Sequence, residues 1–205
     1  MRTSYPRILS VGTANPPTRY TQKEILDRYR VDNPMVRNIF EASHIEGRYL
    51  YLPPVDETGA PKESQSELLK KHRSGALEMA SEAIAKCLKD IDAKPEDVDM
   101  LCCITSTGLM LPGLTAMFIK HLGFRINCHR MDLVGMGCNA GLNGLNPASS
   151  WAAESPCHQT DPSVVVVVAV VAGAVASLET GWGMPACPYL AAVPAVAAWG
   201  VLGTL

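Results

Sequence analysis

The stretch that decides the fold is VGMGCNAGLNGL, residues 134–145. The apolar segment CHRMDLV leads into it, which predicts a strand that ends at Val134 and turns at Gly135 and Gly137. The residues that follow include the small ones Ala140, Gly141 and Gly144. They predict a helix that packs closely against a neighbouring helix. The sequence therefore places Cys138 between a buried strand and the first turn of a helix.

Cys138 is the residue of this stretch that can carry chemistry. A cysteine at a helix start lies near the positive end of the helix dipole and near unpaired N–H groups, and both favour the nucleophilic thiolate. Taken alone, the same cysteine is better explained as a small apolar residue in a glycine-rich packing seam. The glycine spacing differs from the GxGxxG of dinucleotide-binding turns, and no Gly-Lys-Ser/Thr follows as in a P-loop.

Strands and helices alternate on the N-terminal side of this stretch. We expect strands over Arg7–Thr13, Val98–Ile104 and Cys128–Val134. We expect helices after the capping boxes Thr21–Glu24 and Ser64–Glu67, a short one over Met35–His44, and another from Pro112 to Gly123. This alternation predicts an α/β fold with a layered sheet.

A second stretch, CCITSTGLMLPG, resembles the first in its pattern, because residues that can carry chemistry come directly after a buried strand. Ser106 and Thr107 stand at the exit of that strand, where hydroxyl groups can line a pocket. Hydroxyls in such places also often bond only to the nearby backbone. On the residues alone, both interpretations stay open.

Composition excludes several classes of protein. The formal net charge of −2 argues against a nucleic-acid binder, which needs a basic face. Seven cysteines without any CxxC pair predict neither a disulfide framework nor a structural metal site. The N-terminus lacks the apolar core of a signal peptide, so we expect a reduced, cytoplasmic protein.

Residues 147–205 differ from the rest, because they contain no Lys or Arg and are rich in Val, Ala and Pro. Such a segment cannot form an ordinary soluble exterior. It is either buried, with the Val run at 164–171 as a strand, or membrane-associated, or read in an unrelated frame from near Asn146. We expect the last, and we do not expect a membrane span, because prolines interrupt the longest uncharged segment.

Three segments together resemble those of type III polyketide synthases in the thiolase-like superfamily. They are LLKKHRSGALEMA, LCCITSTGLMLPGLTAMFIKHLG and DLVGMGCNAGLNGLN, and within the family they resemble the bacterial 3,5-dihydroxyphenylacetyl-CoA synthase branch. The resemblance covers Arg7–Asn146. It implies a thiolase-like layered fold of which this chain supplies the first core half only, as a domain over 1–146 followed by an atypical tail over 147–205.

The resemblance also implies an activity. Cys138 would accept an acyl group from a coenzyme A thioester, and the carbanion of decarboxylated malonyl-CoA would then attack that thioester. Ser106 and Thr107 match positions that line the growing-chain pocket. Leu111, the third substrate-binding residue that the resemblance implies, matches the residue that reaches toward the partner subunit of a homodimer. Acyl-CoA molecules are the implied partners, and neither a cofactor nor a metal is implied.

The family's catalytic histidine and asparagine lie in its second half, and no matching motif occurs here. We therefore expect self-acylation of Cys138 at most, because decarboxylation would lack its electrostatic support. The alternatives are a 3-oxoacyl-carrier-protein synthase-like condensing enzyme and a non-catalytic or membrane-associated remnant. Arg37 and Arg48 are candidates for coenzyme A phosphates or for solvated surface residues. We expect the histidines before the tail, including His72, to be surface or capping residues, and the patch Lys70–Arg73 to be a solvated face.

Overall fold

The computed structural model describes residues 6–105, 108–136, 139–154, 164–170 and 197–203. Contacts divide the chain into two compact units. Unit 1 comprises residues 1–14, 73–171 and 196–205, and unit 2 comprises residues 15–72 and 172–195.

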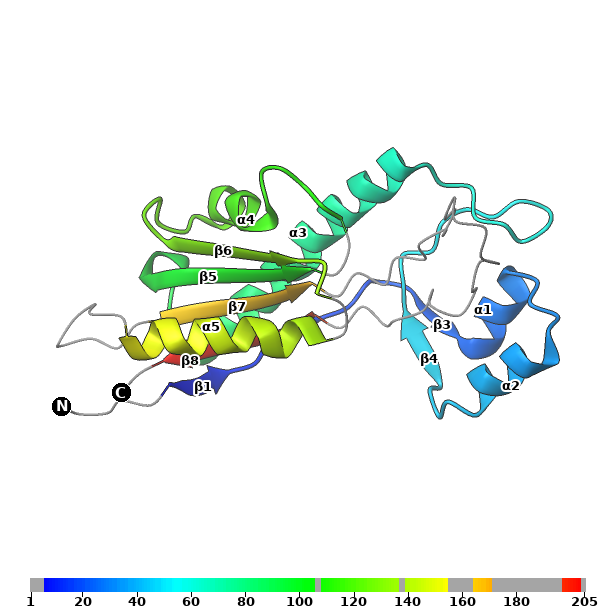
Figure 1. The fold of residues 1–205 in the computed structure, drawn as a ribbon, viewed down its shortest axis with the longest axis horizontal. Coiled ribbons are helices and arrows are strands. Elements are labelled where there is room, and N and C mark those ends of the chain that lie inside the picture. The colour runs from blue at the N-terminus through cyan, green and yellow to red at the C-terminus, as the bar shows by residue number, and fades with distance from the viewer. Residues whose placement is uncertain (1–5, 106–107, 137–138, 155–163, 171–196, 204–205) are drawn as a thin grey trace. The chain divides into compact units, whose positions relative to one another are not determined.

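Unit 1 is built on a mixed six-stranded sheet with the order β1-β8-β7-β5-β6, in which β2 also pairs with β8 (Figure 1). The strands are β1 (Arg7–Ser10), β2 (Thr13–Ala14), β5 (Val98–Thr105), β6 (His129–Val134), β7 (Val164–Val170) and β8 (Ala197–Gly203). β5 runs parallel to β6 and β7, whereas β8 runs antiparallel to β7 and β1. A 3-10 turn, η1 (Pro95–Asp97), leads into β5.

Helices lie on both faces of this sheet. They are α3 (Gln65–Asp90), α4 (Leu114–Leu122) and α5 (Ala140–Glu154). In Figure 1, α5 lies in front of the sheet, and the part of α3 that belongs to unit 1 lies behind it. Alternate residues of β5, such as Cys102 and Ile104, pack with Ala148 and Ala152 of α5 in one apolar cluster. The predicted α/β layering is therefore confirmed.

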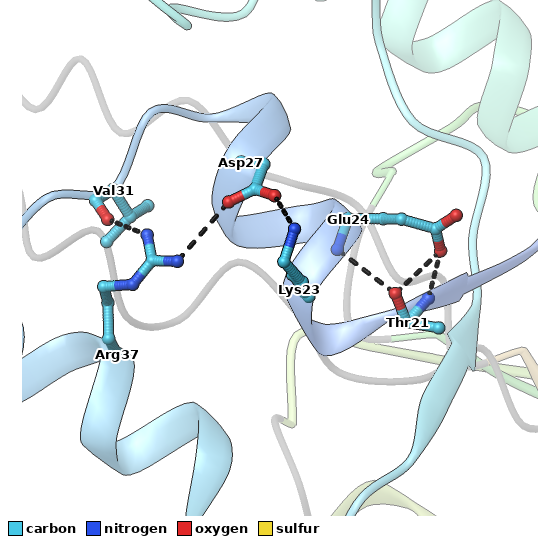
Figure 2. Close-up of polar contacts among 6 residues, drawn as sticks. All are labelled: Thr21, Lys23, Glu24, Asp27, Val31 and Arg37. Atoms are coloured by element: carbon cyan, nitrogen blue, oxygen red, sulfur yellow. Dashed lines mark hydrogen bonds and ion pairs between the residues drawn. The ribbon is translucent and has the colours of Figure 1, made fainter.

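Unit 2 contains a two-stranded antiparallel sheet and two short helices. The strands are β3 (Arg19–Thr21) and β4 (Gly47–Tyr49), and the helices are α1 (Gln22–Arg28) and α2 (Pro34–Glu41). The predicted capping box starts α1, since Glu24 N donates to Thr21 Oγ1 at 3.2 Å and Thr21 N donates to Glu24 Oε2 at 2.7 Å (Figure 2). The second capping box is also present, between Ser64 and Glu67 at the start of α3.

Several element bounds differ from the predictions. The helix expected from Pro112 begins at Leu114, because Gly113 is its N-cap. The helix expected over Met35–His44 spans Pro34–Glu41, with the Asn33 side chain accepting a hydrogen bond from Met35 N at 2.9 Å. The short strands β3 and β4 and the C-terminal β8 were not predicted from the sequence.

The Val run forms β7 as predicted, paired between β5 and β8. Helix α5 continues through Pro147 to Glu154, so the division expected after Asn146 falls inside a helix. The nature of residues 147–205 as a separate or out-of-frame tail stays a prediction.

His72 corrects the expectation of a surface histidine and of a fully solvated Lys70–Arg73 face, because it is only 7% exposed. It lies on α3 four residues before Ala76 and seven before Met79, which are both buried. This spacing continues the apolar stripe of the helix by one turn, so the pattern contained the signal. Lys70 and Arg73 are exposed, and Lys71 makes an ion pair with Glu63 at 2.7 Å.

Burial of His72 predicts a pH-dependent stability. Burial lowers the pKa of His72 from its usual 6.5, so the folded chain binds fewer protons than the unfolded chain below that pH. The contribution of His72 to the free energy of unfolding is therefore complete above pH 6.5. It is lost as the pH drops toward the lowered pKa, by up to about 1.4 kcal/mol per pH unit. Urea unfolding on both sides of this pH measures the slope. His72→Gln should flatten the dependence of the unfolding free energy on pH, and the control His121→Gln, at an exposed position, should leave it unchanged. An unchanged dependence in His72→Gln would contradict the prediction.

Candidate active site

The carboxyl ends of three parallel strands meet at one edge of the sheet. Thr105, the last residue of β5, pairs in register with Val134 of β6 and with Val170 of β7. The last residues of these three strands therefore lie side by side. This edge is where open α/β sheets bind their ligands.

Gly135 forms the turn that follows β6. Its φ of +80° lies in the left-handed region that favours glycine, which confirms the bend predicted at this position. Its backbone N donates a hydrogen bond to Thr105 O at 3.1 Å. This bond ties the segment leading toward Cys138 to the end of β5, from which Ser106 and Thr107 follow.

Ser106, Thr107, Gly137 and Cys138 themselves lie outside the described residues. What the structure does describe are the residues on either side of them. Met136 is exposed, and Ala140, the first residue of α5, is buried at 5% exposure. The roles predicted for Cys138, Ser106 and Thr107 stay predictions.

Helix α5 lies close against β5 at Gly144. A Cβ atom at this position would lie 2.1 Å from Ile104 Cδ1 and 2.6 Å from Ile104 Cγ1, so only glycine fits the observed packing. Ala140 and Gly144 pack closely as predicted, but the neighbour is the strand β5 and not a helix. Close packing at Gly141 was predicted wrongly, because no atom of another element among the described residues lies within 4 Å of a Cβ there. Gly144 therefore sets how near the start of α5 lies to the strand edge.

Leu111 lies on the segment between β5 and α4 and is 94% exposed. Leu109 of the same segment is also exposed. A contact between Leu111 and an acyl chain or a partner subunit stays a prediction.

Among the described residues, the other cysteines are poorly suited to nucleophilic chemistry. Cys87, Cys102, Cys103 and Cys128 are all buried free thiols. Burial raises the pKa of Cys102 to about 12 and that of Cys128 to about 11, and it raises the pKa of Cys103 as well. The thiols of Cys102, Cys103 and Cys128 therefore stay protonated at neutral pH, whereas the thiolate is the reactive form.

Sequence reasoning missed a contact that holds the start of α4. Thr115 donates to the Asp132 carboxylate of β6 from its backbone N, at 3.1 Å to Oδ1, and from its hydroxyl. A Cβ at Gly113 would lie 2.6 Å from the Asp132 Cγ, so the glycine leaves room for this carboxylate. The sequence signalled this contact only indirectly, because α4 starts at a glycine, Gly113, which has no side chain to cap the helix.

The two arginines considered for phosphate binding are used inside unit 2. Arg37 donates to Val31 O at 2.7 Å and makes a 3.4 Å ion pair with Asp27 (Figure 2). Arg48 is only 8% exposed and donates to Gln22 Oε1 at 3.2 Å, so its expected role as a solvated surface residue is wrong. These contacts give both guanidinium groups a structural use.

The described part of the chain holds no group of three or more His, Cys, Asp or Glu side chains arranged to bind a metal. None of its helices has both the length and the apolar character needed to cross a membrane.

Comparison with known proteins adds the family. The chain is 49% identical over 152 residues to a 3,5-dihydroxyphenylacetyl-CoA synthase of Streptomyces toyocaensis, which covers 74% of this chain and 39% of that protein. It is 45% identical over 155 residues to the Amycolatopsis orientalis protein of the same name, with coverages of 75% and 42%. The chain thus spans about two fifths of the length of these curated relatives.

The fold matches the crystal structure of PKS-I from the brown alga Ectocarpus siliculosus. The TM-score is 0.80 at 24% identity, with 99% of this chain and 57% of that chain covered. This likeness confirms that the chain has the layered, thiolase-like fold, of which it covers the N-terminal part. A family model described as FAE1/Type III polyketide synthase-like protein matches residues 18–173. The chain therefore belongs to the FAE1/type III polyketide synthase-like family.

Proposed function

We propose that this chain supplies the acyl-accepting half of a type III polyketide synthase, with Cys138 as the nucleophile. The observation that carries the proposal is the hydrogen bond from Gly135 N to Thr105 O. It joins the segment that leads to Cys138 to the strand edge from which Ser106 and Thr107 follow. The likeness to 3,5-dihydroxyphenylacetyl-CoA synthases supports coenzyme A thioesters as the substrate class.

The chemistry divides a difficult condensation into two steps. In the first, the Cys138 thiolate attacks the carbonyl carbon of an acyl-CoA, forming the cysteine thioester and releasing coenzyme A as its thiolate. In the second, malonyl-CoA loses CO₂, and its enolate carbon attacks that thioester. A carbon–carbon bond forms, the Cys138 thiolate leaves, and the new chain on coenzyme A is longer by two carbons.

The second step needs groups that stabilise the enolate. The resemblance places these in the second half of the longer relatives, so we propose that the residues of this chain perform acylation without sustained condensation. A product resembling 3,5-dihydroxyphenylacetyl-CoA would then require the remaining part of the fold. A cytoplasmic location stays part of the proposal.

We also propose a homodimer. β6 is the last strand of the sheet as described, and its residues Arg130, Asp132 and Val134 are exposed. The side of a strand that lacks a neighbour offers backbone hydrogen bonds to another chain. The exposed Leu111 is the side chain that we expect at this interface.

Intact-mass analysis tests the acyl transfer. The purified chain is incubated with acetyl-CoA, with malonyl-CoA, or with the same acyl groups on a carrier protein. The proposal predicts one adduct per chain from the coenzyme A thioesters, with release of one coenzyme A. Acylation by the carrier protein alone would favour the 3-oxoacyl-carrier-protein synthase-like alternative, and no adduct from any donor would favour the non-catalytic remnant.

A further inference from the structure

The start of α4 depends on a side chain from another element. Its N-cap residue Gly113 makes no side-chain hydrogen bond to the first turn. The Asp132 carboxylate of β6 takes over this function, because it accepts hydrogen bonds from both the backbone N and the hydroxyl of Thr115. Thr115 is 1% exposed, so the partner of the carboxylate is itself held firmly in the core.

The arrangement is favourable for a carboxylate in particular. The first turn of a helix presents unpaired N–H groups and the positive end of the helix dipole, and both attract an anion. The absence of a Cβ at Gly113 allows the carboxylate to approach, since that atom would lie 2.6 Å from the Asp132 Cγ. Gly113, Thr115 and Asp132 therefore form one interlocking joint between α4 and β6.

This joint controls the segment that carries Leu111. The segment is connected at one end to β5 and at the other to the first turn of α4. Because Leu111 is 94% exposed, its own side chain adds little to hold it in place. Its position is therefore set mainly by the two ends of the segment, and Asp132 fixes one of them.

We propose that Asp132 is a positioning residue for the acyl transfer: by holding the first turn of α4 on β6, it fixes the place of Leu111 and thereby the acyl-chain selectivity. This inference rests on the proposed function, in which Leu111 faces the acyl chain or the partner subunit. Asp132 itself touches no reacting atom in this account.

The test compares the acylation rates with acetyl-CoA and hexanoyl-CoA. Asp132→Ala should change the ratio of the two rates several-fold, in the same direction as Leu111→Ala, and the double variant should change it no further. Asp132→Asn should keep the wild-type ratio, because its amide can accept from the Thr115 backbone N and donate to the Thr115 hydroxyl oxygen. Lys120→Ala, an exposed position in the last turn of α4, is the matched control.

A loss of rate in Asp132→Ala with the ratio unchanged, or an additive effect with Leu111→Ala, overturns the proposal. Hydrogen exchange gives a second readout that needs no activity. Amides of the segment from Leu109 to Met117 should exchange faster in Asp132→Ala, and those of β5 should not change. If no variant is acylated, the proposed function fails, and unchanged exchange in this segment then overturns the positioning role separately.

Discussion

Replacing Cys138 by alanine should abolish transfer of the acyl group from coenzyme A to the chain. The attacking sulfur is then absent, and the buried thiols elsewhere cannot substitute for it. Burial keeps the pKa of Cys102 at about 12 and that of Cys128 at about 11, so neither offers a thiolate at neutral pH. The rate of adduct formation should fall by roughly 10³-fold or more, as for the loss of other catalytic nucleophiles.

The matched control for this variant is Cys128→Ala, which removes a buried thiol directly before β6, at the end of the strand opposite to the one that leads toward Cys138. It should form the adduct at the wild-type rate. Time-resolved intact-mass spectra of the two variants and the wild type measure both effects. An adduct that persists at full rate in Cys138→Ala would contradict the role of this cysteine.

Substitution of Gly144 by valine should have the largest effect on stability. The Cβ would lie 2.1 Å from Ile104 Cδ1, and Ile104 is 2% exposed, so the side chain has little room to move away. Overpacking of this kind destabilises a protein by about 1–3 kcal/mol. Urea or thermal unfolding should show this loss, and acylation should slow because the start of α5 moves away from the strand edge.

Gly141 offers a control in the same helix. No atom of another element among the described residues lies within 4 Å of a Cβ at this position, so Gly141→Val lacks the contact that blocks a Cβ at Gly144. Because glycine is a weak helix former, this variant should be more stable than the wild type by about 0.3 kcal/mol. Equal destabilisation by the two substitutions would show that the contact with Ile104 is not the cause.

Local sequence patterns predicted the elements that carry the site. The continuous apolar run at β5 identified a strand buried on both faces, and Thr21–Glu24 and Ser64–Glu67 marked two helix starts. Each of these signals lies within a few residues of the element that it predicts. The turn at Gly135 was predictable for the same reason, and so was close packing at Gly144, although its neighbour is β5 and not the helix that was expected.

What could not be predicted depends on contacts between distant residues. The bond between Thr115 and Asp132 joins residues 17 positions apart, and that between Arg48 and Gln22 joins residues 26 apart. Nothing local distinguishes such a buried or anchored polar residue from one on the surface. β8 was missed for a related reason, since it becomes a strand through its pairing with β7 and β1.

The site of acylation among the seven cysteines is the most direct test of the central claim. The chain is incubated with malonyl-CoA or acetyl-CoA, digested, and mapped by peptide mass spectrometry. A single acylated peptide that contains Cys138, with every other cysteine unmodified, is the predicted result. Acylation of a different cysteine, or a chain without any acyl group, would contradict the account.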